Sequence, residues 1–294
     1  MEALEQLQSG ISQAASAASP ALVGVGGRWT AGSGVIAGPG RILTNAHNLR
    51  GSQAAITFSD GLTTTARVAG SDIDGDIAVL DADTGDRPAI RWAGGEIEVG
   101  MPVVALANPG GRGLRVTLGF VSGTERSFRG PRGRLVAGAV EHTAPLLPGS
   151  SGGPVVDLSG RLLGINTNRL GDGFYLALPA DDDLKRRVDS LGRGEEPRRV
   201  RLGVSLAPAH VARRLRRAVG LQEIDGLLVR GVEDDGPAAA VGVREGDLIV
   251  EADGRAIEDF DALVNAVESA QGSLRLKLVR GTDELEVEVG LQEG

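Results

Sequence analysis

The sequence predicts an all-β domain followed by a small α+β domain, on three observations. The chain has 294 residues, which is more than a single domain usually holds, and 45 of them are Gly. Short runs rich in β-branched residues, punctuated by Gly, Pro, Asn and Asp, extend from Pro20 to Pro179 with no convincing helix among them. After Pro179 helical and strand-like patterns alternate. Many short strands joined by tight turns are typical of a β-sandwich or a pair of β-barrels.

The first part of the chain begins with a polar, Ala- and Ser-rich segment, residues 1–19, that favours a helix or an extended arm. The runs that follow are predicted to be strands because each combines β-branched residues with turn residues at both ends. They cover residues 22–25, 34–37, 41–43, 54–58, 64–68, 77–80, 103–107, 116–121, 135–140, 155–156, 162–165 and 174–178.

The pattern changes near Pro179. Residues 180–191 place Leu184, Val188 and Leu191 at helical spacing, so they predict a helix that closes the first domain, 20–191. Residues 192–199 are rich in Gly, Glu, Pro and Arg and are predicted to form a linker. The second domain, 200–294, is predicted to contain strands at 202–206, 227–232, 248–252, 274–279 and 284–289 and helices at 208–219, 238–241 and 259–270.

Composition excludes several functions. The net charge of -8 disfavours nucleic acid as a partner, because phosphate binding needs a cationic surface. There is no Cys, which excludes disulfides and thiolate metal sites, and no ligand cluster with metal-site spacing, so we expect no metal or cofactor. No run of about 18 apolar residues predicts a membrane span, and residues 1–19 do not resemble a signal peptide. We therefore expect a cytoplasmic location for the chain as it stands, or a periplasmic or other extracytoplasmic one if an export signal or anchor has been removed.

Residues 149–154 read Gly-Ser-Ser-Gly-Gly-Pro and predict a nucleophile on a tight turn. A reactive serine needs an exposed hydroxyl and backbone amides directed at the oxyanion that forms in acyl transfer, and flanking glycines allow such a turn. We predict Ser151 as the nucleophile. The predicted oxyanion hole is the turn Gly149, Ser150 and Ser151, with the amides of Gly149 and Ser151 as donors.

A serine nucleophile needs a base, and His47, which ends the string Thr-Asn-Ala-His directly after a predicted strand, is the candidate. The chain has three histidines. His142 is the rival base because it is nearer to Ser151 in sequence, but it lies within a strand-like stretch. His210 lies in the second domain and is predicted to be on the surface.

The base in turn needs a buried acceptor, and Asp76 opens the apolar strand predicted at 77–80. A carboxylate in that position needs a specific partner to compensate its burial. Asp72, Asp74 and Asp81 remain alternatives at this stage. The order His, Asp, Ser is that of chymotrypsin-like double β-barrel enzymes rather than subtilisin-like ones.

The strings at 44–47, 76–80 and 148–154 resemble the three active-site blocks of the HtrA (Deg) family of serine proteases, and those at 32–36, 163–167 and 174–179 resemble further blocks. The resemblance implies a chymotrypsin-like protease domain plus one PDZ domain, and it implies that Asp76 is the triad acid. It further implies an ATP-independent endopeptidase, active in protein quality control, that cleaves unfolded or C-terminally exposed polypeptides. The rival function is a catalytically silent, chaperone-like peptide-binding protein.

The second domain resembles a PDZ domain at residues 202–204 and 236–249. The resemblance implies that amides near Leu202 and Gly203 take a C-terminal carboxylate, with Arg199 or Arg201 assisting, while the strand edge pairs with the peptide. The residues predicted to bind the peptide are Leu202, Gly203, Val204, Leu263, Val264 and Val267.

The predicted substrate pocket carries no charge, so we expect cleavage after small or medium aliphatic residues. Its walls are predicted to be Leu147, Ile165, Asn166, Thr167 and Phe174. Two residues depart from the family pattern: Ser150 stands where Asn is usual, and Asn48 stands where an apolar residue is usual. The resemblance also implies a homo-trimer held by N-terminal aromatics; residues 1–28 contain none, which leaves another homo-oligomer as the alternative.

Overall fold

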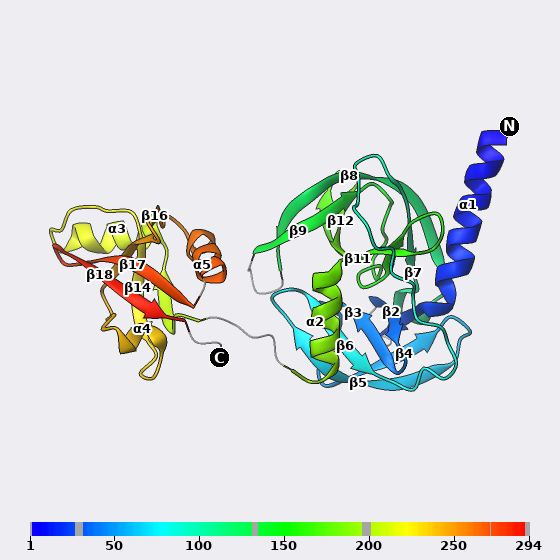
Figure 1. The fold of residues 1–294 in the computed structure, drawn as a ribbon, viewed down its shortest axis with the longest axis horizontal. Coiled ribbons are helices and arrows are strands. Elements are labelled where there is room, and N and C mark those ends of the chain that lie inside the picture. The colour runs from blue at the N-terminus through cyan, green and yellow to red at the C-terminus, as the bar shows by residue number, and fades with distance from the viewer. Residues whose placement is uncertain (1, 27–31, 131–134, 196–200, 271, 292–294) are drawn as a thin grey trace. The chain divides into compact units, whose positions relative to one another are not determined.

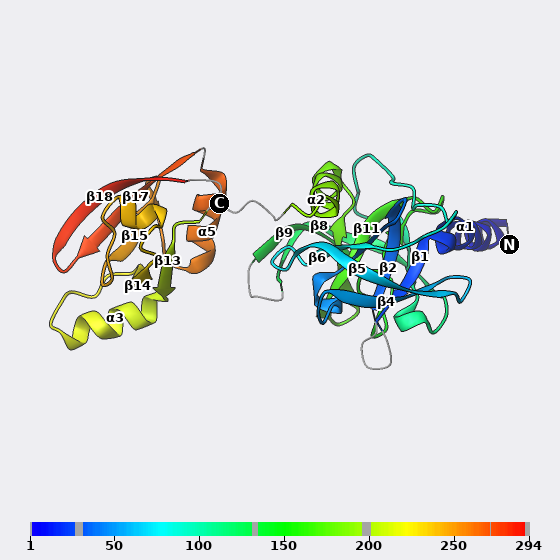
Figure 2. The same ribbon diagram turned by 90° about the horizontal axis from the view of Figure 1, so that it is seen from below.

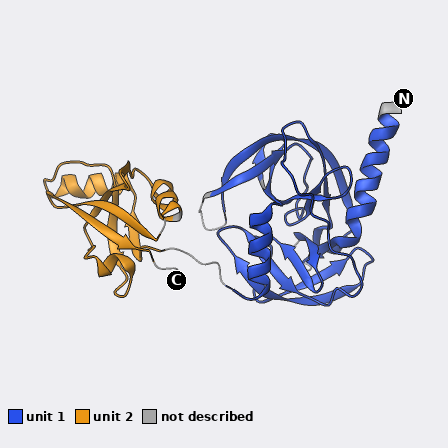
Figure 3. Ribbon diagram, in the orientation of Figure 1, with its two compact units in different colours: residues 1–197 blue, residues 198–294 orange. Residues whose placement is uncertain are grey.

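The computed structural model describes residues 2–26, 32–130, 135–195, 201–270 and 272–291. These residues form two compact units, Met1–Pro197 and Arg198–Gly294, shown in different colours in Figure 3. The division lies within the predicted linker 192–199. Residues 196–199 of that linker, among them Arg199, lie outside the described residues.

The first unit begins with helix α1, Glu2–Ala18, and a single 3-10 turn, η1, Ser19–Ala21. Of the two alternatives for residues 1–19, the helix is therefore the one observed; Ala, Leu, Glu and Gln all favour it. Ala14 and Ala18 are buried, and α1 lies along one side of the unit with its N-terminal end directed away from it (Figure 1).

A closed six-stranded antiparallel barrel follows, in the order β1-β2-β3-β6-β5-β4. Its members are short, as the turn residues between the runs predict. They are β1 Leu22–Val25, β2 Gly32–Gly38, β3 Arg41–Thr44, β4 Gln53–Phe58, β5 Thr63–Asp72 and β6 Ile77–Asp81, with the 3-10 turn η2 Ala46–Asn48 after β3.

A second closed barrel has the order β10-β11-β12-β9-β8-β7. Figures 1 and 2 show the two barrels side by side within the unit. Its strands are β7 Pro102–Ala107, β8 Arg115–Arg129, β9 Leu135–His142, β10 Pro154–Val156, β11 Leu162–Gly171 and β12 Phe174–Pro179, with the 3-10 turn η3 Pro109–Gly111 after β7. The structure thus confirms the predicted double β-barrel and excludes a sandwich, since each sheet closes on itself and leaves no edge.

Helix α2, Asp182–Gly192, closes the first unit. The Asp181 side chain caps it by accepting a hydrogen bond from the amide of Leu184 at 2.8 Å. Leu184, Val188 and Leu191 are buried, and α2 contacts β5 and β6. The predicted helical face is therefore the face that packs. No helix among the described residues is long and apolar enough to span a membrane.

The second unit is a sheet in the order β13-β14-β15-β17-β18, with β16 paired to β15. Its apolar core includes Leu202, Leu227, Ile249, Leu263 and Leu276. Its elements are β13 Val204–Ala207, α3 Ala209–Ala218, β14 Leu227–Val232, α4 Pro237–Ala240, β15 Leu248–Ala252, β16 Arg255–Ala256, α5 Phe260–Ser269, β17 Ser273–Arg280 and β18 Asp283–Gly290.

Two details of the second unit differ from prediction. The first strand starts at Val204 rather than at Leu202, because Gly203 takes a left-handed φ of 71° and interrupts the extended backbone. The two-residue strand β16 was not predicted, because Arg255 and Ala256 form too short a run to show a period.

Candidate active site

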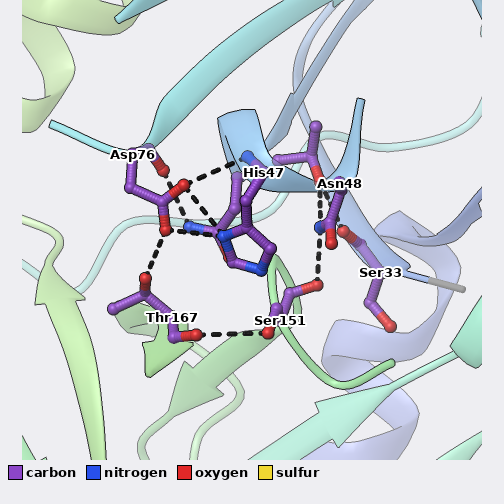
Figure 4. A network of polar contacts seen from close by, with 8 residues as sticks. Ser33, His47, Asn48, Asp76, Ser151 and Thr167 are labelled. Carbon is purple, nitrogen blue, oxygen red and sulfur yellow. Dashed lines mark hydrogen bonds and ion pairs between the residues drawn. The ribbon is translucent and has the colours of Figure 1, made fainter. Parts of the chain in front are cut away.

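Two neighbouring strands of the first barrel place His47 and Asp76 together. His47 lies in η2 just after β3, and Asp76 lies just before β6. The two strands are antiparallel, with Thr44 opposite Ala78, so the end of one lies beside the start of the other. Figure 4 shows the two side chains directed at each other.

The imidazole of His47 and the carboxylate of Asp76 are in direct contact. His47 Nδ1 lies 2.9 Å from Asp76 Oδ1 and 2.8 Å from Oδ2, and the His47 amide donates to Oδ1 at 3.2 Å. The hydroxyl of Thr167 donates to Oδ2 at 2.6 Å. Asp76 is buried, 2% exposed, so these donors compensate the loss of water from a charged group. Since a carboxylate only accepts, Nδ1 of His47 carries the proton and Nε2 is left as the basic nitrogen.

The backbone of Asp76 is held in an uncommon conformation, with φ of 53°. Aspartate tolerates this left-handed region better than most residues. The Asn45 amide side chain donates to the Asp76 carbonyl at 2.8 Å. Just ahead of it, Asp72 accepts from the amide of Gly75 at 3.1 Å and from Arg187 of α2 at 2.9 Å. The turn is therefore fixed at both ends.

Those contacts also distinguish Asp76 from the rival carboxylates. Asp72 pairs with Arg187, and Asp81 pairs with Arg41. Asp76, rather than Asp72, Asp74 or Asp81, accepts the hydrogen bonds described for His47.

Ser151 lies on a tight turn just before β10, and the backbone conformation of this turn requires glycines. Gly149 and Gly152 have φ of 89° and 85°. A Cβ on Gly152 would lie 2.0 Å from the Ser33 carbonyl oxygen, and one on Gly153 would lie 2.3 Å from that of Leu106. The glycines of the motif therefore allow the turn to press against the strands of both barrels.

The hydrogen bonds of this turn leave two amides for a ligand. The amide of Ser150 donates to the Leu147 carbonyl at 3.0 Å, and that of Gly152 donates to Asn166 at 2.7 Å. The amides of Gly149 and Ser151 have no acceptor among the described residues. These are the two donors that the motif predicts. Ser150 belongs to the turn, but its own amide is occupied and its side chain is buried, so it is not a third donor.

Thr167 connects the acid to the serine. Its hydroxyl donates to Asp76, and its carbonyl accepts the hydroxyl proton of Ser151 at 3.1 Å (Figure 4). The described contacts include no hydrogen bond between Ser151 and His47. In unliganded sites such a bond is often long and tightens when substrate binds.

A cavity of about 180 Å³ opens beside Ser151. Of the residues predicted to form the substrate pocket, Leu147 and Thr167 line this cavity, whereas Ile165 and Asn166 are fully buried and do not line it. Phe174 does not line it and is 40% exposed. The complete lining is Leu146, Leu147, Pro148, Gly149, Ser150, Ser151, Thr167, Arg169 and Tyr175.

The prediction of Phe174 as a wall fails for a simple geometric reason. Successive residues of a strand face opposite sides, so Tyr175 faces the cavity and Phe174 does not. The pairing of Arg169 on β11 with Tyr175 on β12 brings Arg169 to the same place. The sequence analysis missed both residues. The alternation within residues 174–178 required a choice between Phe174 and Tyr175, but nothing in the sequence fixed the register that adds Arg169.

The other two histidines lie away from this chemistry. His142 is fully buried on β9, with Nε2 3.0 Å from Asn166 Oδ1 and its ring stacked on that of Tyr175. Burial lowers the pKa of His142 to about 4, against a smaller raising effect of the Asn166 hydrogen bond. His210 is exposed on α3, as predicted.

In the second unit, the strand β13 lies at an edge of the sheet, since β14 is its only partner among the strands that the structure describes. Leu202, Leu263 and Val267 are buried together in the core, while Val204 and Val264 are partly exposed. The carbonyls of Leu202 and Gly203 accept the amides of Ala238 and Glu233, both at 2.9 Å. The amides of Leu202 and Gly203 donate to no backbone carbonyl of the described residues.

Among the described residues, no group of three or more His, Asp or Glu is arranged to hold a metal ion.

Comparisons with known proteins match this geometry. Residues 32–165 match the trypsin-like peptidase domain family, and residues 200–291 match the PDZ domain family. HhoA of Synechocystis sp., named as a serine protease, is 34% identical over 276 residues, covering 88% of this chain and 69% of the relative. The chain belongs to the HtrA family.

Other HtrA relatives give the same result. A protein of Halomonas elongata named as a DegP-like periplasmic serine endoprotease is 32% identical over 277 residues, 89% of this chain and 56% of its own length. The chain spans about half the length of several such curated relatives. Two solved structures are each 28% identical: the HtrA-type protease AlgW with a decapeptide, TM-score 0.72, covering 97% of this chain and 99% of that one, and a serine endoprotease from Yersinia pestis, TM-score 0.71, covering 97% and 98%.

Asn48, which departs from the HtrA pattern, makes contacts that the sequence did not reveal. The carbonyl of Ser151 accepts the amide of Ser33 at 2.9 Å and the side chain of Asn48 at 3.0 Å. Asn48 also donates to the Thr44 hydroxyl at 3.0 Å. The Ser33 hydroxyl donates to the Gly149 carbonyl at 2.8 Å. The first barrel thus holds both ends of the serine turn, which belongs to the second.

Proposed function

We propose that this HtrA chain is an ATP-independent serine endopeptidase that cleaves unfolded or C-terminally exposed polypeptides in protein quality control. One observation supports this most directly: His47, Asp76 and Thr167 form a hydrogen-bonded set that reaches the hydroxyl of Ser151, beside two unoccupied amide donors. The relatives named as a serine endoprotease and as a serine protease support the same activity.

In the proposed mechanism Ser151 Oγ exchanges its hydrogen bond to Thr167 for one to His47 Nε2 when substrate binds. Nε2 takes the hydroxyl proton as Oγ attacks the scissile carbonyl carbon, and the carbonyl electrons move onto its oxygen. The amides of Gly149 and Ser151 stabilise that oxyanion. His47 then gives its proton to the leaving amine as the C–N bond breaks. Water, deprotonated by His47, hydrolyses the acyl-enzyme and restores Ser151.

Asp76 has two tasks in this mechanism. It fixes the His47 tautomer that leaves Nε2 basic, and its negative charge stabilises the imidazolium that forms in each half-reaction. The hydrogen bond from Thr167 holds one carboxylate oxygen, which leaves little freedom for the His47 ring to rotate. A catalytically silent binding protein would not require these groups to stay assembled, so the rival function is not favoured.

We further propose that the second unit captures the C-termini of substrates. A peptide would pair with the open edge of β13 as an added strand, its carboxylate would meet the amides of Leu202 and Gly203, and its last side chain would rest between β13 and α5. The HtrA-type protease AlgW has been solved with a decapeptide, which supports peptide binding by this family. The periplasmic relatives support an extracytoplasmic location, and a homo-trimer or another homo-oligomer remains the expectation from the family.

Degradation of casein by the purified chain tests the activity. Ser151→Ala should abolish hydrolysis, and loss of a triad nucleophile costs on the order of 10⁶ in turnover. His47→Ala should be nearly as damaging, and Asp76→Asn severe but smaller. Combining these substitutions should add little, because the three groups act as a unit. Hydrolysis by Ser151→Ala at the wild-type rate would reject the proposal.

Titration of the full-length Ser151→Ala chain with matched peptides tests the carboxylate capture. Peptides ending in Val with a free carboxylate should bind with micromolar affinity, about -8 kcal/mol. The same peptides with an amidated C-terminus should lose most of it, because the amide pair no longer meets an anion. Equal affinity for the two forms would instead assign the unit to a structural or interface role.

A further inference from the structure

The Gly149 amide, one of the two proposed oxyanion donors, has to be held in place indirectly. An N–H that serves the substrate cannot be occupied by a protein acceptor, so its direction depends on how the rest of its residue is fixed. Gly149 has a φ of 89° and no side chain that restricts its rotation. The accuracy of this donor therefore depends on the contacts that the Gly149 carbonyl and the neighbouring peptide make.

The peptide unit between Gly149 and Ser150 is fixed at both of its ends. The amide of Ser150 donates to the Leu147 carbonyl at 3.0 Å. The carbonyl of Gly149 accepts the hydroxyl of Ser33 at 2.8 Å. The first contact lies within the turn itself, whereas the second comes from β2 of the first barrel. Ser33 therefore ties the Gly149 end of the turn to the other barrel.

A third segment sets the direction of the Ser33 hydroxyl. Its oxygen accepts a hydrogen bond from the amide of Asn108, just after β7, at 2.9 Å. Since an N–H only donates, the hydroxyl proton points away from Asn108 and is given to Gly149. Ser33 is 0% exposed and Asn108 is 4% exposed, so water does not compete for either contact. The buried hydroxyl thus has one defined donor and one defined acceptor.

The two oxyanion donors differ in how much support they receive. The carbonyl of Ser151 accepts both the amide of Ser33 at 2.9 Å and the side chain of Asn48 at 3.0 Å. Among the hydrogen bonds of the described residues, the Gly149 carbonyl takes part only in the one from the Ser33 hydroxyl. Removal of that hydroxyl therefore releases Gly149 and leaves Ser151 held, because the backbone amide at position 33 remains.

We propose that the side chain of Ser33 is a positioning residue for the oxyanion hole, which holds Gly149 so that its amide meets the oxyanion formed on the scissile carbonyl. This assignment rests on the proposed proteolytic function. Ser33 touches neither the substrate nor the reacting atoms. The donor matters most when negative charge develops, since the neutral carbonyl of the bound substrate needs it less. Loss of the hydroxyl lowers kcat and leaves KM close to the wild-type value.

Ser33→Ala tests the assignment in steady-state cleavage of a quenched fluorescent peptide. Removal of a whole oxyanion donor costs about 10²–10³ in kcat, and a donor that is present but no longer held costs less. We expect kcat to fall by about tenfold while KM changes by less than about twofold, with active sites counted by complete fluorophosphonate labelling. Ser33→Thr keeps a hydroxyl and should restore most of the rate.

Ser122→Ala is the matched control. It removes a buried hydroxyl from β8 of the second barrel that has no hydrogen-bond partner among the described residues. This variant should keep the wild-type kcat and KM.

A peptide boronic acid separates positioning from general damage to the site. Bound to Ser151 Oγ it forms a tetrahedral anion with an oxygen in the oxyanion hole, whereas the uncleaved substrate peptide presents a neutral carbonyl. Ser33→Ala should weaken inhibition by the boronic acid by about the same factor as kcat/KM. The affinity of the substrate peptide, measured in a Ser151→Ala background, should stay the same with and without Ser33→Ala.

Several results would overturn the proposal. Wild-type kcat in Ser33→Ala would reject it, and so would equal losses of boronic acid and substrate affinity, which indicate a site distorted as a whole. A rate for Ser33→Thr no higher than that of Ser33→Ala would count against the hydroxyl. All of these leave the protease function intact. A wild-type chain that neither cleaves peptides nor is labelled by the fluorophosphonate would overturn both the protease function and this inference.

Discussion

The burial of His142 predicts that the stability of the first unit depends on pH. The residue is fully buried, and the acceptor it faces is fixed: the side-chain nitrogen of Asn166 donates to Gly153 at 3.1 Å, so its oxygen faces His142 Nε2. Nε2 therefore carries the proton, and Nδ1 is a buried lone pair with no hydrogen-bond partner among the described residues. A second proton would place a charged N–H there with no acceptor.

The direction and size of the effect follow from the pKa. Burial lowers the pKa of His142 from 6.5 to about 4, so between these values the unfolded chain binds the proton and the folded chain does not. Stability rises with pH wherever the unfolded state binds more protons, so this contribution is complete above pH 6.5 and is lost as the pH falls towards 4. Its full size is on the order of 3 kcal/mol, of which about 2 kcal/mol is lost by about pH 5.

Urea unfolding between about pH 7.5 and 5, followed by tryptophan fluorescence, measures this term. Both tryptophans of the chain, Trp29 and Trp92, belong to the first unit, so the signal reports that unit alone. We expect His142→Gln in a Ser151→Ala background, which prevents self-cleavage, to flatten the fall in unfolding free energy. His210→Gln, at an exposed histidine, is the control and should keep the parental slope.

The slope, rather than the absolute stability, is the observable, because Gln in place of a stacked imidazole changes packing at every pH. Asp and Glu residues that titrate near pH 4 contribute equally to parent and variants, so the difference between slopes isolates His142. The same slope in His142→Gln and its parent would refute the argument that this histidine is held neutral by burial.

Three further predictions concern the serine turn and the second unit. Ser151→Ala should remove hydrolysis while Ser150→Ala retains it, because Ser150 closes the turn through its backbone amide, which Ala also has. The opposite result in a casein assay would reverse the assignment. Asn48→Ala should lower kcat by about two- to tenfold with little change in KM, since it loses one neutral hydrogen bond to the Ser151 carbonyl, worth about 0.5–1.5 kcal/mol; an unchanged kcat would show that the remaining donor holds the turn alone. Asp247→Ala should destabilise the second unit by about 2–4 kcal/mol, measured by calorimetry. The Asp247 carboxylate is fully buried and accepts hydrogen bonds from the Arg280 guanidinium at 2.7 and 2.8 Å. A loss below about 1 kcal/mol would mean that solvent compensates the Arg280 charge.

The serine motif shows why part of the site could be predicted from sequence alone. Gly149, Gly152 and Gly153 are required by backbone conformation and by contacts too close for a Cβ. The motif can therefore be recognised from the sequence, because these local requirements fix its residue types. His47 and Asp76 were identifiable because each adjoins a strand whose apolar pattern is clear. The choice of Asp76 over its rivals nevertheless came from the family resemblance, and the geometry of the acid turn supplies the physical reason for it.

What the sequence by itself determined is what depends on short-range pattern: twelve short strands, a closing helix, a second α+β domain and the motifs that carry Ser151, His47 and Asp76. What only the tertiary structure decided depends on register and on contacts between distant segments. The pairing of β11 with β12 brings Arg169 into the pocket with Tyr175 and leaves Phe174 outside. The packing of one barrel on the other lets Asn48 reach the Ser151 carbonyl across 103 positions of sequence. Side-chain alternation and turn residues can be recognised in short stretches of sequence, whereas strand register depends on how both barrels pack as a whole.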